Sequence, residues 1–361
     1  MRFKISRWIV WSVIGLMLPL GVRADGLPPA PQMKTTTFER DADGHLIVAP
    51  PRALHVCPSG CDFASIDLAA KDATDGSTIT VEPGLYTAAV ILRASGVTIQ
   101  AKPGAHLKGA LAEGKAAIVA KGNDTIIDGL ECSGVEAPDH NGACVRTEGH
   151  NLTLRHIYFH DAEEGLLTGM GTGDIVIEDS RFERLGKNGF AHAIYIGSLD
   201  SVTIRRSSFL SSRNEGHEVK SRAARTTIED SVIASLDGVD SRLLDIPNGG
   251  EVSLRNCVLE KGPRAANHNL IGFGLEGIKH EVNSLTLENV EIILDNPAAR
   301  IFDGPIQPVL RGVRVVGGDN LADASRAVTW FPGRAAARLP AYPKLPSAYS
   351  SAGVSGDRSD N

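Results

Sequence analysis

Apolar residues along this chain recur in short alternating runs. In residues 151–159 and 174–182, an apolar residue is followed by a second two places later and by a third five places after that. The pattern recurs, more weakly in the last case, at residues 201–209, 225–233, 251–259, 284–292 and 307–315. Alternation with a period of two predicts strands with one buried face, and no helical spacing separates the runs.

The runs form a repeat of 23 to 33 residues, measured between their central apolar residues: Ile99, Ile127, Leu154, Ile177, Ile204, Ile228, Leu254, Leu287 and Leu310. A unit of this length cannot bury its own apolar face, so the units must stack. Short strands joined by turns at this period predict an all-β fold, a parallel β-solenoid. Leucine-rich repeats are the alternative, but their Leu-x-x-Leu-x-Leu and Asn pattern is absent.

The beginning of the stack is also visible in the sequence. Residues 63–73 have helical spacing of apolar positions, and the strand pattern 78–81 follows. A short amphipathic helix would cover the open end of the stack and prevent edge-to-edge pairing. Residues 63–86, which include Asp75-Gly-Ser-Thr-Ile-Thr-Val-Glu-Pro-Gly-Leu-Tyr86, resemble the first coil of the pectate-lyase-like superfamily. The resemblance spans roughly residues 55–318 and implies a right-handed parallel β-helix with an N-terminal capping helix.

Composition agrees with a single narrow solenoid. The 361 residues include 38 Gly and only 5% aromatic residues. The 42% hydrophobic and 22% charged residues exclude wholesale disorder. A net charge of −6 without a long basic run argues against nucleic acid as a partner. We therefore expect one β-helical domain, residues 51–318.

The two ends differ from the repeat. Residues 1–24 are typical of a signal peptide, because three basic residues precede an apolar run from Trp8 to Gly21. An uncleaved anchor is the alternative, but the run is short for a membrane span. Cleavage would remove four basic residues, leave a charge of −10 and place the protein in the periplasm or outside the cell. Residues 25–50 form a Pro-rich lead-in, and residues 319–361 are expected to be an irregular, disordered tail.

Export would permit disulfides among the five cysteines. Cys57 and Cys61 could close a tight loop, Cys132 could pair with Cys144, and Cys257 would remain a buried thiol. A zinc site is the competing interpretation, but the sequence lacks a second CxxC-type pair to complete it.

A second strand of each coil can be aligned between residues 144 and 273. If Val145, Leu167, Ile194, Val219, Leu244 and Ile271 point inward, the next residues form an outward column of Arg146, Thr168, Tyr195, Lys220, Asp245 and Gly272. Two places before four of these inward residues stand His192, His217, Arg242 and Asn269. These reach the outer face only if the chain bends there. With that bend, three consecutive coils carry His-Tyr, His-Lys and Arg-Asp pairs; a purely structural ladder is the alternative.

The charge around Lys220 favours an anionic ligand. Residues 201–228 hold six basic residues (Arg205, Arg206, Arg213, Lys220, Arg222 and Arg225) and two acidic residues (Glu215 and Glu218). A local positive field within an acidic chain suits an anion. Turn positions account for Arg205 and Arg206, so Lys220 and Arg222 are the stronger candidates.

β-Elimination of a uronate polymer matches these residue types. The reaction needs a base, a cation for the carboxylate and an acid for the leaving oxygen, and a lysine crowded by other cations can be the base. We predict Lys220 as the base with Arg242, Arg222 and His217 nearby. An arginine can bind the carboxylate through two hydrogen bonds, and Tyr195 or His192 can supply the proton. Further substrate contacts are predicted at the end of the strand and on neighbouring coils: Arg222, Asp245, Asn248, His268, Arg146 and, more weakly, Glu276.

The resemblance adds to this prediction. Lys220-Ser221 is similar to the Lys-Ser of β-helix alginate and dermatan lyases, whose lysine is the base. Residues 189–198 resemble the Gly-His-Gly strand of polygalacturonases, but Leu166-Leu167-Thr168 stands where those hydrolases carry an Asp pair. The outward Asp pair of pectin esterases is missing as well.

We therefore expect an exported protein that acts on an acidic polysaccharide or oligosaccharide, by lyase-type β-elimination or by C5-epimerase-type proton abstraction. The alternative is a non-enzymatic carbohydrate-binding or exopolysaccharide-assembly protein on the same scaffold. No cofactor is expected; Asp161, Glu163 and Glu164 suggest Ca²⁺ only loosely. We also expect a monomer, no nucleic-acid partner and no stable membrane span after signal cleavage.

Overall fold

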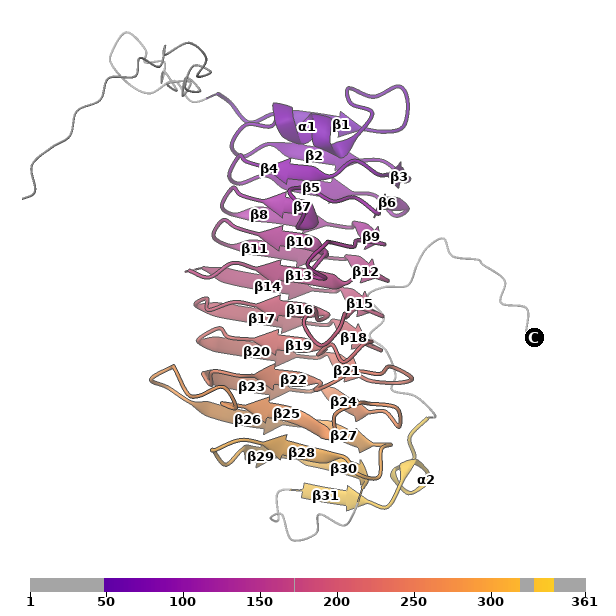
Figure 1. Cartoon of the computed structure of the whole chain (residues 1–361), viewed down its shortest axis with the longest axis vertical. Coiled ribbons are helices and arrows are strands. Elements are labelled where there is room, and N and C mark those ends of the chain that lie inside the picture. The colour runs from indigo at the N-terminus through magenta and orange to yellow at the C-terminus, as the bar shows by residue number, and fades with distance from the viewer. Residues whose placement is uncertain (1–48, 172, 319–327, 341–361) are drawn as a thin grey trace, which may run out of the picture. The chain divides into compact units, whose positions relative to one another are not determined.

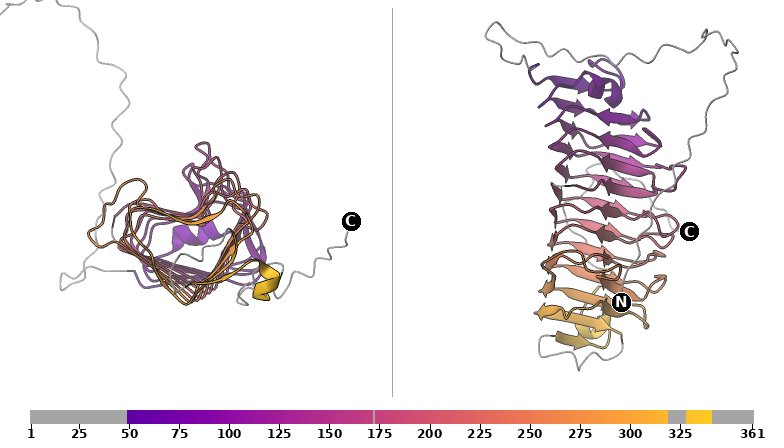
Figure 2. Two further views of the ribbon diagram at one scale, coloured as in Figure 1. Left: turned by 90° about the horizontal axis from the view of Figure 1, so that it is seen from below. Right: turned by 60° about the vertical axis from the view of Figure 1, so that its left-hand side comes forward.

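The chain winds into a solenoid of parallel strands. The computed structural model describes residues 49–171, 173–318 and 328–340. Within these residues the strands form three sheets, and each full coil adds one strand to each sheet in turn (Figure 1). Viewed along its axis, the solenoid has three sides (Figure 2). The prediction of an all-β parallel solenoid is confirmed.

Sheet 1 carries the repeat that the sequence pattern identified. Its strands, in spatial order, are β1 (Ala53–Val56), β2 (Thr78–Val81), β5 (Thr98–Ala101), β8 (Thr125–Asp128), β11 (Leu152–Arg155), β14 (Asp174–Glu178), β17 (Ser201–Arg205), β20 (Arg225–Glu229), β23 (Glu251–Arg255), β26 (Ser284–Glu288) and β29 (Val309–Arg311). The nine predicted central residues, from Ile99 to Leu310, pair in one unbroken column. The predicted register of this sheet is therefore confirmed.

Sheet 2 follows sheet 1 after a two-residue corner in most coils. Its strands are β3 (Gly84–Tyr86), β6 (Ala105–Lys108), β9 (Glu131–Ser133), β12 (Tyr158–His160), β15 (Arg181–Glu183), β18 (Ser208–Leu210), β21 (Val232–Ala234), β24 (Val258–Lys261), β27 (Glu291–Leu294), β30 (Val313–Gly317) and β31 (Val328–Phe331). The first corner residue has a positive φ of 47° to 54° at His156, Asp179, Arg206, Asp230, Asn256 and Asn289. A left-handed residue turns the chain within one position, and Asn and Asp tolerate that conformation best.

Sheet 3 completes each coil and presents the candidate site. Its strands are β4 (Val90–Leu92), β7 (Ala116–Ala120), β10 (Ala143–Thr147), β13 (Glu164–Thr168), β16 (Ile194–Ile196), β19 (Val219–Ser221), β22 (Leu244–Ile246), β25 (Asn269–Phe273) and β28 (Arg300–Asp303). The loops from sheet 2 into sheet 3 are longer than the corners after sheet 1. Ala112, on the loop between β6 and β7, packs against Val119 and Leu167 on the outer face of sheet 3.

The interior is mainly aliphatic, as the composition indicated. Three of its few rings lie in one sheet 2 column, where Phe159, Phe182 and Phe209 contact one another at centroid distances of 5.7 and 4.7 Å. Helix α1 (Ile66–Asp72) buries Ile66, Ala69 and Ala70 and lies across the N-terminal end of the stack (Figures 1 and 2). The capping helix is thus present where the spacing predicted it.

Both predicted disulfides are present. Cys57 bonds to Cys61 and Cys132 to Cys144, and Cys257 is a buried free thiol. The sequence interpretation that favoured disulfides over zinc at these cysteines is confirmed.

One boundary differs from the prediction. Residues 319–361 were expected to be irregular, but β31 pairs in parallel with β30, and helix α2 (Arg334–Ala337) follows it. Strand pairing and the burial of Ala337 against Ile293 and Val316 order this part of the predicted tail. The predicted signal peptide, almost all of the lead-in and the remainder of the tail lie outside the described residues. Among the residues that are described, no helix has the length and apolar character needed to cross a membrane.

Candidate functional site

The outer face of sheet 3 carries a column of chemically active side chains. Strands β16, β19 and β22 are successive neighbours in sheet 3 (Figure 1). Tyr195 on β16, Lys220 on β19 and Asp245 on β22 pair directly across them. Backbones of neighbouring strands lie about 4.8 Å apart, so these side chains are adjacent. The column continues to Gly272 on β25. The predicted stacking of these four residues is present.

The prediction was wrong by one residue on β13. Leu166, not Leu167, pairs with the inward Ile194, and Leu167 pairs with Tyr195 in the outward column. Leu167 is covered on the outer face by an apolar cluster that includes Ala116, Val119 and Ala143. Two consecutive leucines left the sequence pattern ambiguous, because either could fill the core. Thr168 therefore follows the column instead of belonging to it.

A second polar column flanks the first because the chain bends before each strand. His192 and His217 stack at a ring-centroid distance of 4.7 Å, and His192 also contacts the edge of Tyr195 at 5.7 Å. The backbone N–H of His217 donates to His192 Nδ1, and the backbone N–H of Arg242 donates to His217 Nδ1, each at 3.0 Å. The bend that the sequence interpretation required is therefore real.

These hydrogen bonds set the protonation of both rings. Each Nδ1 accepts, so each neutral ring carries its hydrogen on Nε2. Burial lowers the pKa of His217 to about 3, with Lys220 and Arg242 adding to the effect. Burial also lowers the pKa of His192 well below its ordinary value, helped by His217 and Lys220. Both imidazoles are neutral near pH 7.

Arg222 is the centre of the hydrogen-bond network. Its guanidinium donates from Nε to the Tyr195 hydroxyl at 2.7 Å, from one terminal nitrogen to Asn248 Oδ1 at 2.6 Å and from the other to Glu276 Oε2 at 2.8 Å. These four side chains line a cavity of about 370 Å³ together with Thr168, Met170, Gly197, Ser198 and Lys279. The predicted position of Asn248 at the rim of a groove is present, and Arg222 lines the same cavity.

Lys220 lies beside this cavity without a close partner. Its Nζ is 3.8 Å from Asp245 Oδ2, 3.9 Å from Glu276 Oε1 and 5.2 Å from the Tyr195 ring centroid. The side chain is 14% exposed. Among the described residues no side-chain hydrogen bond holds it, so its amine can reach a ligand.

Asp245 lies beneath the site rather than on its surface. The side chain is buried, and its carboxylate is 3.2 Å from Arg242 and 3.5 Å from His217 Nε2. Burial raises the pKa of Asp245, while Lys220 and Arg242 oppose that rise. Gly272 provides room for this arrangement, because a Cβ there would lie 2.6 Å from Arg242 Cδ and Nε. Asp245 therefore orients its cationic neighbours.

Glu164 was not recognised from the sequence as part of this site. It stands two places before Leu166 and thus occupies, on its coil, the position of His192 and His217. The side chain is fully buried and neither carboxylate oxygen has a hydrogen-bond partner. Burial raises the pKa of Glu164 well above its ordinary value, against the pull of Arg146 and Lys220. The correct register of β13 was the signal that would have identified it.

The remaining predicted residues lie at or beyond the margin. Arg146 occupies the same column as Tyr195 but is separated from it by Leu167. Among the described residues, the exposed side chain of His268 forms no hydrogen bond or ion pair with the site. The three carboxylates considered for Ca²⁺ do not converge: Asp161 binds Arg184, Glu163 accepts backbone hydrogens from Ala137 and Gly142, and Glu164 is buried as above.

The predicted positive stretch is divided between faces. Arg205 and Arg206 lie at the end of β17 in sheet 1, where they pair with Glu178, Glu229 and Asp179. Arg225 pairs with Glu251 on the next coil. The expectation of one positive field over residues 201–228 was wrong, because neighbouring coils supply compensating carboxylates. Only Lys220 and Arg222 from this stretch face the candidate site.

A second cavity is chemically different. It has a volume of about 780 Å³ and lies near the C-terminal end of the solenoid, where mainly apolar residues such as Leu285, Leu287 and Phe302 line it. Arg300 is the sole ionisable residue of that lining. Converging polar groups identify a reactive site better than cavity volume does. The outer face of sheet 3 around Tyr195, Lys220 and Arg222, the Tyr195–Lys220 face, is therefore the candidate site.

Comparisons with known proteins bear on the fold. No family model and no curated protein matches the sequence. The structure is similar to that of an alginate lyase from Paenibacillus sp. str. FPU-7, with a TM-score of 0.51 and 15% identity over 78% of this chain and 98% of the lyase. It is also similar to pectate lyase Pel9A, with a TM-score of 0.52 and 15% identity over 79% of each chain. At this identity the likeness concerns the fold alone. The chain therefore has the right-handed parallel β-helix fold that these two lyases share.

Proposed function

We propose that this protein is a lyase that cleaves an acidic, uronate-containing polysaccharide by β-elimination at the Tyr195–Lys220–Arg222 face. The single observation that carries the proposal is the juxtaposition of these groups: Tyr195 and Lys220 are cross-strand partners, and Arg222 donates to the Tyr195 hydroxyl at 2.7 Å. A possible base thus lies beside an open cavity that holds a possible acid and a carboxylate-binding cation.

Each group has a role in the reaction. Lys220, in its amine form, takes the proton on the carbon beside the uronate carboxylate. Arg222 binds that carboxylate and stabilises the negative charge that develops on it. Tyr195 gives its proton to the glycosidic oxygen as the carbon–oxygen bond breaks and the carbon–carbon double bond forms. His192 and His217 are neutral, and we assign them to positioning.

Glu276 marks the place of the substrate carboxylate. Its two oxygens face Arg222 and Lys220, and its side chain is 51% exposed on the segment after β25. An entering uronate carboxylate can displace this side chain and take over its contacts. The proposed reaction uses the charges of the chain itself and needs no metal or other cofactor. We also propose that the protein is exported to the periplasm or outside the cell and acts as a monomer.

The test is to incubate the protein with a panel of uronate polymers and to measure product formation from the absorbance of the unsaturated product. Lys220→Arg keeps the charge but removes an effective base, and we expect at least a ~10²-fold loss of turnover with oligosaccharide binding retained. Tyr195→Phe should lose a similar factor. Lys102→Arg is the matched control, because Lys102 is a surface lysine paired with Glu82.

Other outcomes separate the rival functions. Absence of product on every polymer, with binding retained, would overturn the lyase in favour of a carbohydrate-binding protein. Incorporation of solvent deuterium at the uronate carbon without chain cleavage would instead indicate a C5-epimerase, which needs the same proton abstraction.

A further inference from the structure

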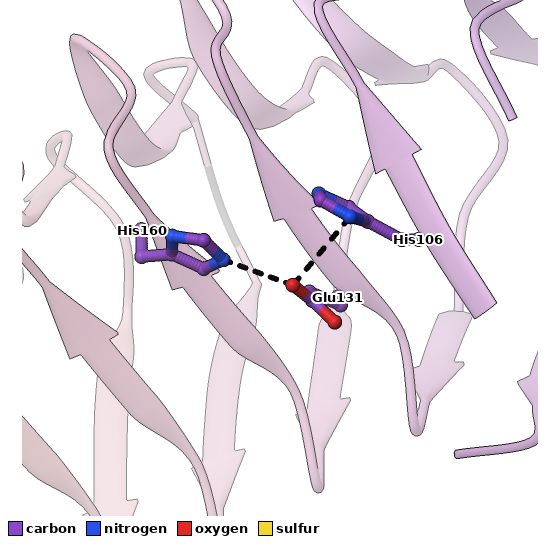
Figure 3. A group of neighbouring side chains, drawn as sticks. All are labelled: His106, Glu131 and His160. Carbon is purple, nitrogen blue, oxygen red and sulfur yellow. Dashed lines mark hydrogen bonds and ion pairs between the residues drawn. The ribbon is translucent and has the colours of Figure 1, made fainter. Parts of the chain in front are cut away.

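Three ligand-type side chains meet on the outer face of sheet 2. His106 on β6, Glu131 on β9 and His160 on β12 come from three consecutive coils and converge around one point (Figure 3). Glu131 Oε1 is 3.1 Å from His160 Nε2 and 3.5 Å from His106 Nδ1. One nitrogen or oxygen from each residue lies within 4.8 Å of the others. In the part of the chain that the structure describes, no other group of three histidine, cysteine or acidic residues meets this criterion.

The spacing suits a small divalent ion. Zinc bonds to nitrogen and oxygen of about 2.0–2.1 Å place tetrahedral ligand atoms about 3.4 Å apart. The two distances to Glu131 already have this size, so a small inward movement of the His106 and His160 rings completes the set. All three side chains are partly exposed, at 14% to 28%, which leaves a path for the ion and an open position for water.

The other nitrogen of each ring has its own partner. His160 Nδ1 is 2.7 Å from Asp161 Oδ2, and His106 Nε2 is 2.8 Å from Ser133 Oγ. Arg184 in turn holds Asp161 through two hydrogen bonds of 2.9 and 2.7 Å. A carboxylate behind a histidine fixes the ring and increases its basicity, an arrangement typical of metal-binding histidines.

The stacking of a neighbouring ring adds to this orientation. The Tyr158 ring lies 4.2 Å from the His160 ring at an interplanar angle of 22°. His160 therefore has its plane fixed by Tyr158 and its outer nitrogen fixed by Asp161, so Nε2 can point only toward Glu131.

The charges of the group favour a cation. Two carboxylates, those of Glu131 and Asp161, lie on either side of the His160 ring and contact its two nitrogens at 3.1 and 2.7 Å. The Glu131 carboxylate also lies 3.5 Å from His106 Nδ1, on the open side of the group.

We propose that His106, Glu131 and His160 form a binding site for a divalent transition-metal ion, best matched by Zn²⁺, that links three consecutive coils of sheet 2. Two imidazoles and one carboxylate favour zinc over Ca²⁺, which takes oxygen ligands in larger number. The site is separate from the Tyr195–Lys220 face, because the two lie on different sheets. Its role is to stabilise the N-terminal half of the solenoid, and the open position retains a water molecule.

The test is calorimetric titration of Zn²⁺ into the full chain without an affinity tag, after treatment with a chelator. We expect one ion per chain, a rise in melting temperature with added Zn²⁺, and no comparable effect of Ca²⁺. The disulfides occupy four cysteines and Cys257 is buried, so thiols do not compete. Cobalt substitution should give visible absorption bands of a four-coordinate ion.

Variants distinguish the site from general surface binding. His160→Ala and His106→Ala should each abolish tight Zn²⁺ binding, and Asp161→Asn should weaken it by roughly 10- to 100-fold. His156→Ala is the matched control, because His156 is an exposed histidine that pairs with one carboxylate, Asp128, at 2.8 Å. Binding that survives in both alanine variants, or a folded wild-type chain that shows no stoichiometric Zn²⁺ binding, would overturn the proposal. These readouts do not depend on lyase activity.

Discussion

Two lysines on neighbouring parts of the solenoid carry the same charge in opposite settings. Lys261 ends β24 inside the solenoid, in register with the core residue Leu294, and is fully buried. Its Nζ is 2.9 Å from Asp240 Oδ2 and also donates to the carbonyl of Ser241. Lys220 lies on the outer face, with its nearest carboxylates at 3.8 and 3.9 Å.

This difference distinguishes a lysine that stabilises the fold, Lys261, from a lysine that is available to a ligand, Lys220. A buried ammonium must have its hydrogens taken by acceptors, since each unpaired polar group there is costly. Two acceptors, Asp240 Oδ2 and the Ser241 carbonyl, hold the Lys261 ammonium, and its full burial keeps it from contacting a ligand. Lys220 is compensated only at longer range, so its amine remains available. Distance to the partner, and not the presence of one, distinguishes the two lysines.

Removing the buried lysine is the most severe way to test this contrast. Lys261→Met leaves Asp240 as a buried charge without its partner, and we expect a loss of roughly 3–5 kcal/mol in the free energy of unfolding. Lys220→Met should change it by less than ~1 kcal/mol. Urea denaturation measures both values. If Lys261→Met does not fold, adding Asp240→Asn should restore folding in part. Equal stability of the two lysine variants would contradict the comparison.

The buried cluster should also give stability a pH dependence. Burial raises the pKa of Glu218 to about 8, and Asp240 adds to this effect. The folded state then binds the proton more tightly than the unfolded state, so the stabilisation is complete below the ordinary glutamate pKa and is lost as the pH rises through about 8.

Glu218→Gln tests this dependence. The amide preserves the contacts with the Ser212 backbone and hydroxyl, which lie at 2.7 and 2.8 Å. We expect the variant to gain roughly 2 kcal/mol relative to the wild type between pH 6 and pH 9. Glu276→Gln, on the exposed site, should show no such gain. A difference between wild type and Glu218→Gln that stays constant with pH would refute the assignment.

A smaller effect is expected at Glu276, whose carboxylate lies on the Tyr195–Lys220 face. Glu276→Gln removes the negative charge that faces Arg222 and Lys220. We expect affinity for an acidic oligosaccharide to rise by roughly 2- to 5-fold, since exposed charge pairs contribute less than ~1 kcal/mol. Glu281→Gln, an exposed neighbour on the same segment, is the control. Binding isotherms with acidic and neutral oligosaccharides measure the effect, and weaker acidic binding would argue that Glu276 contacts the ligand favourably.

The smallest effect is expected at Gly272. In Gly272→Ala, the new Cβ would meet Arg242 Cδ and Nε, and the flexible arginine can move aside. We expect a loss of less than ~1 kcal/mol in stability and a several-fold loss of turnover, because Arg242 and Asp245 no longer hold Lys220 in place. An unchanged rate with unchanged stability would show that Arg242 has no positioning role.

The sequence predicted the fold well because a solenoid repeats one local rule. The alternating residues around Leu154 and Ile177 specify both burial and register, and the paired cysteines lie near each other in that register. The column of Tyr195, Lys220 and Asp245 followed from the same rule. Leu166 and Leu167 broke it, since the pattern cannot choose between two adjacent leucines.

Other features of the structure could not be predicted from the local pattern of apolar and polar residues. Arg205 and Arg206 were counted with Lys220 because they are close in sequence, yet one turn of the coil carries them to another side of the solenoid. The approach of His106, Glu131 and His160 depends on which coils stack and how far each side chain leans. Burial of Glu164 depends on the loops that cover sheet 3, whose lengths vary from coil to coil.

The stacked histidines His192 and His217 restrict which hydrogen-bonding groups can lie next to them. Because each Nδ1 is occupied by the backbone N–H of the next coil, each ring offers a hydrogen atom and no lone pair to its other neighbours. Burial holds the pKa of His217 to about 3, so this polarity persists across the physiological range. Beside them, Arg222 and Arg242 can only donate as well. That flank therefore favours neighbours that offer oxygen lone pairs, as Asp245 Oδ2 does at 3.5 Å from His217 Nε2.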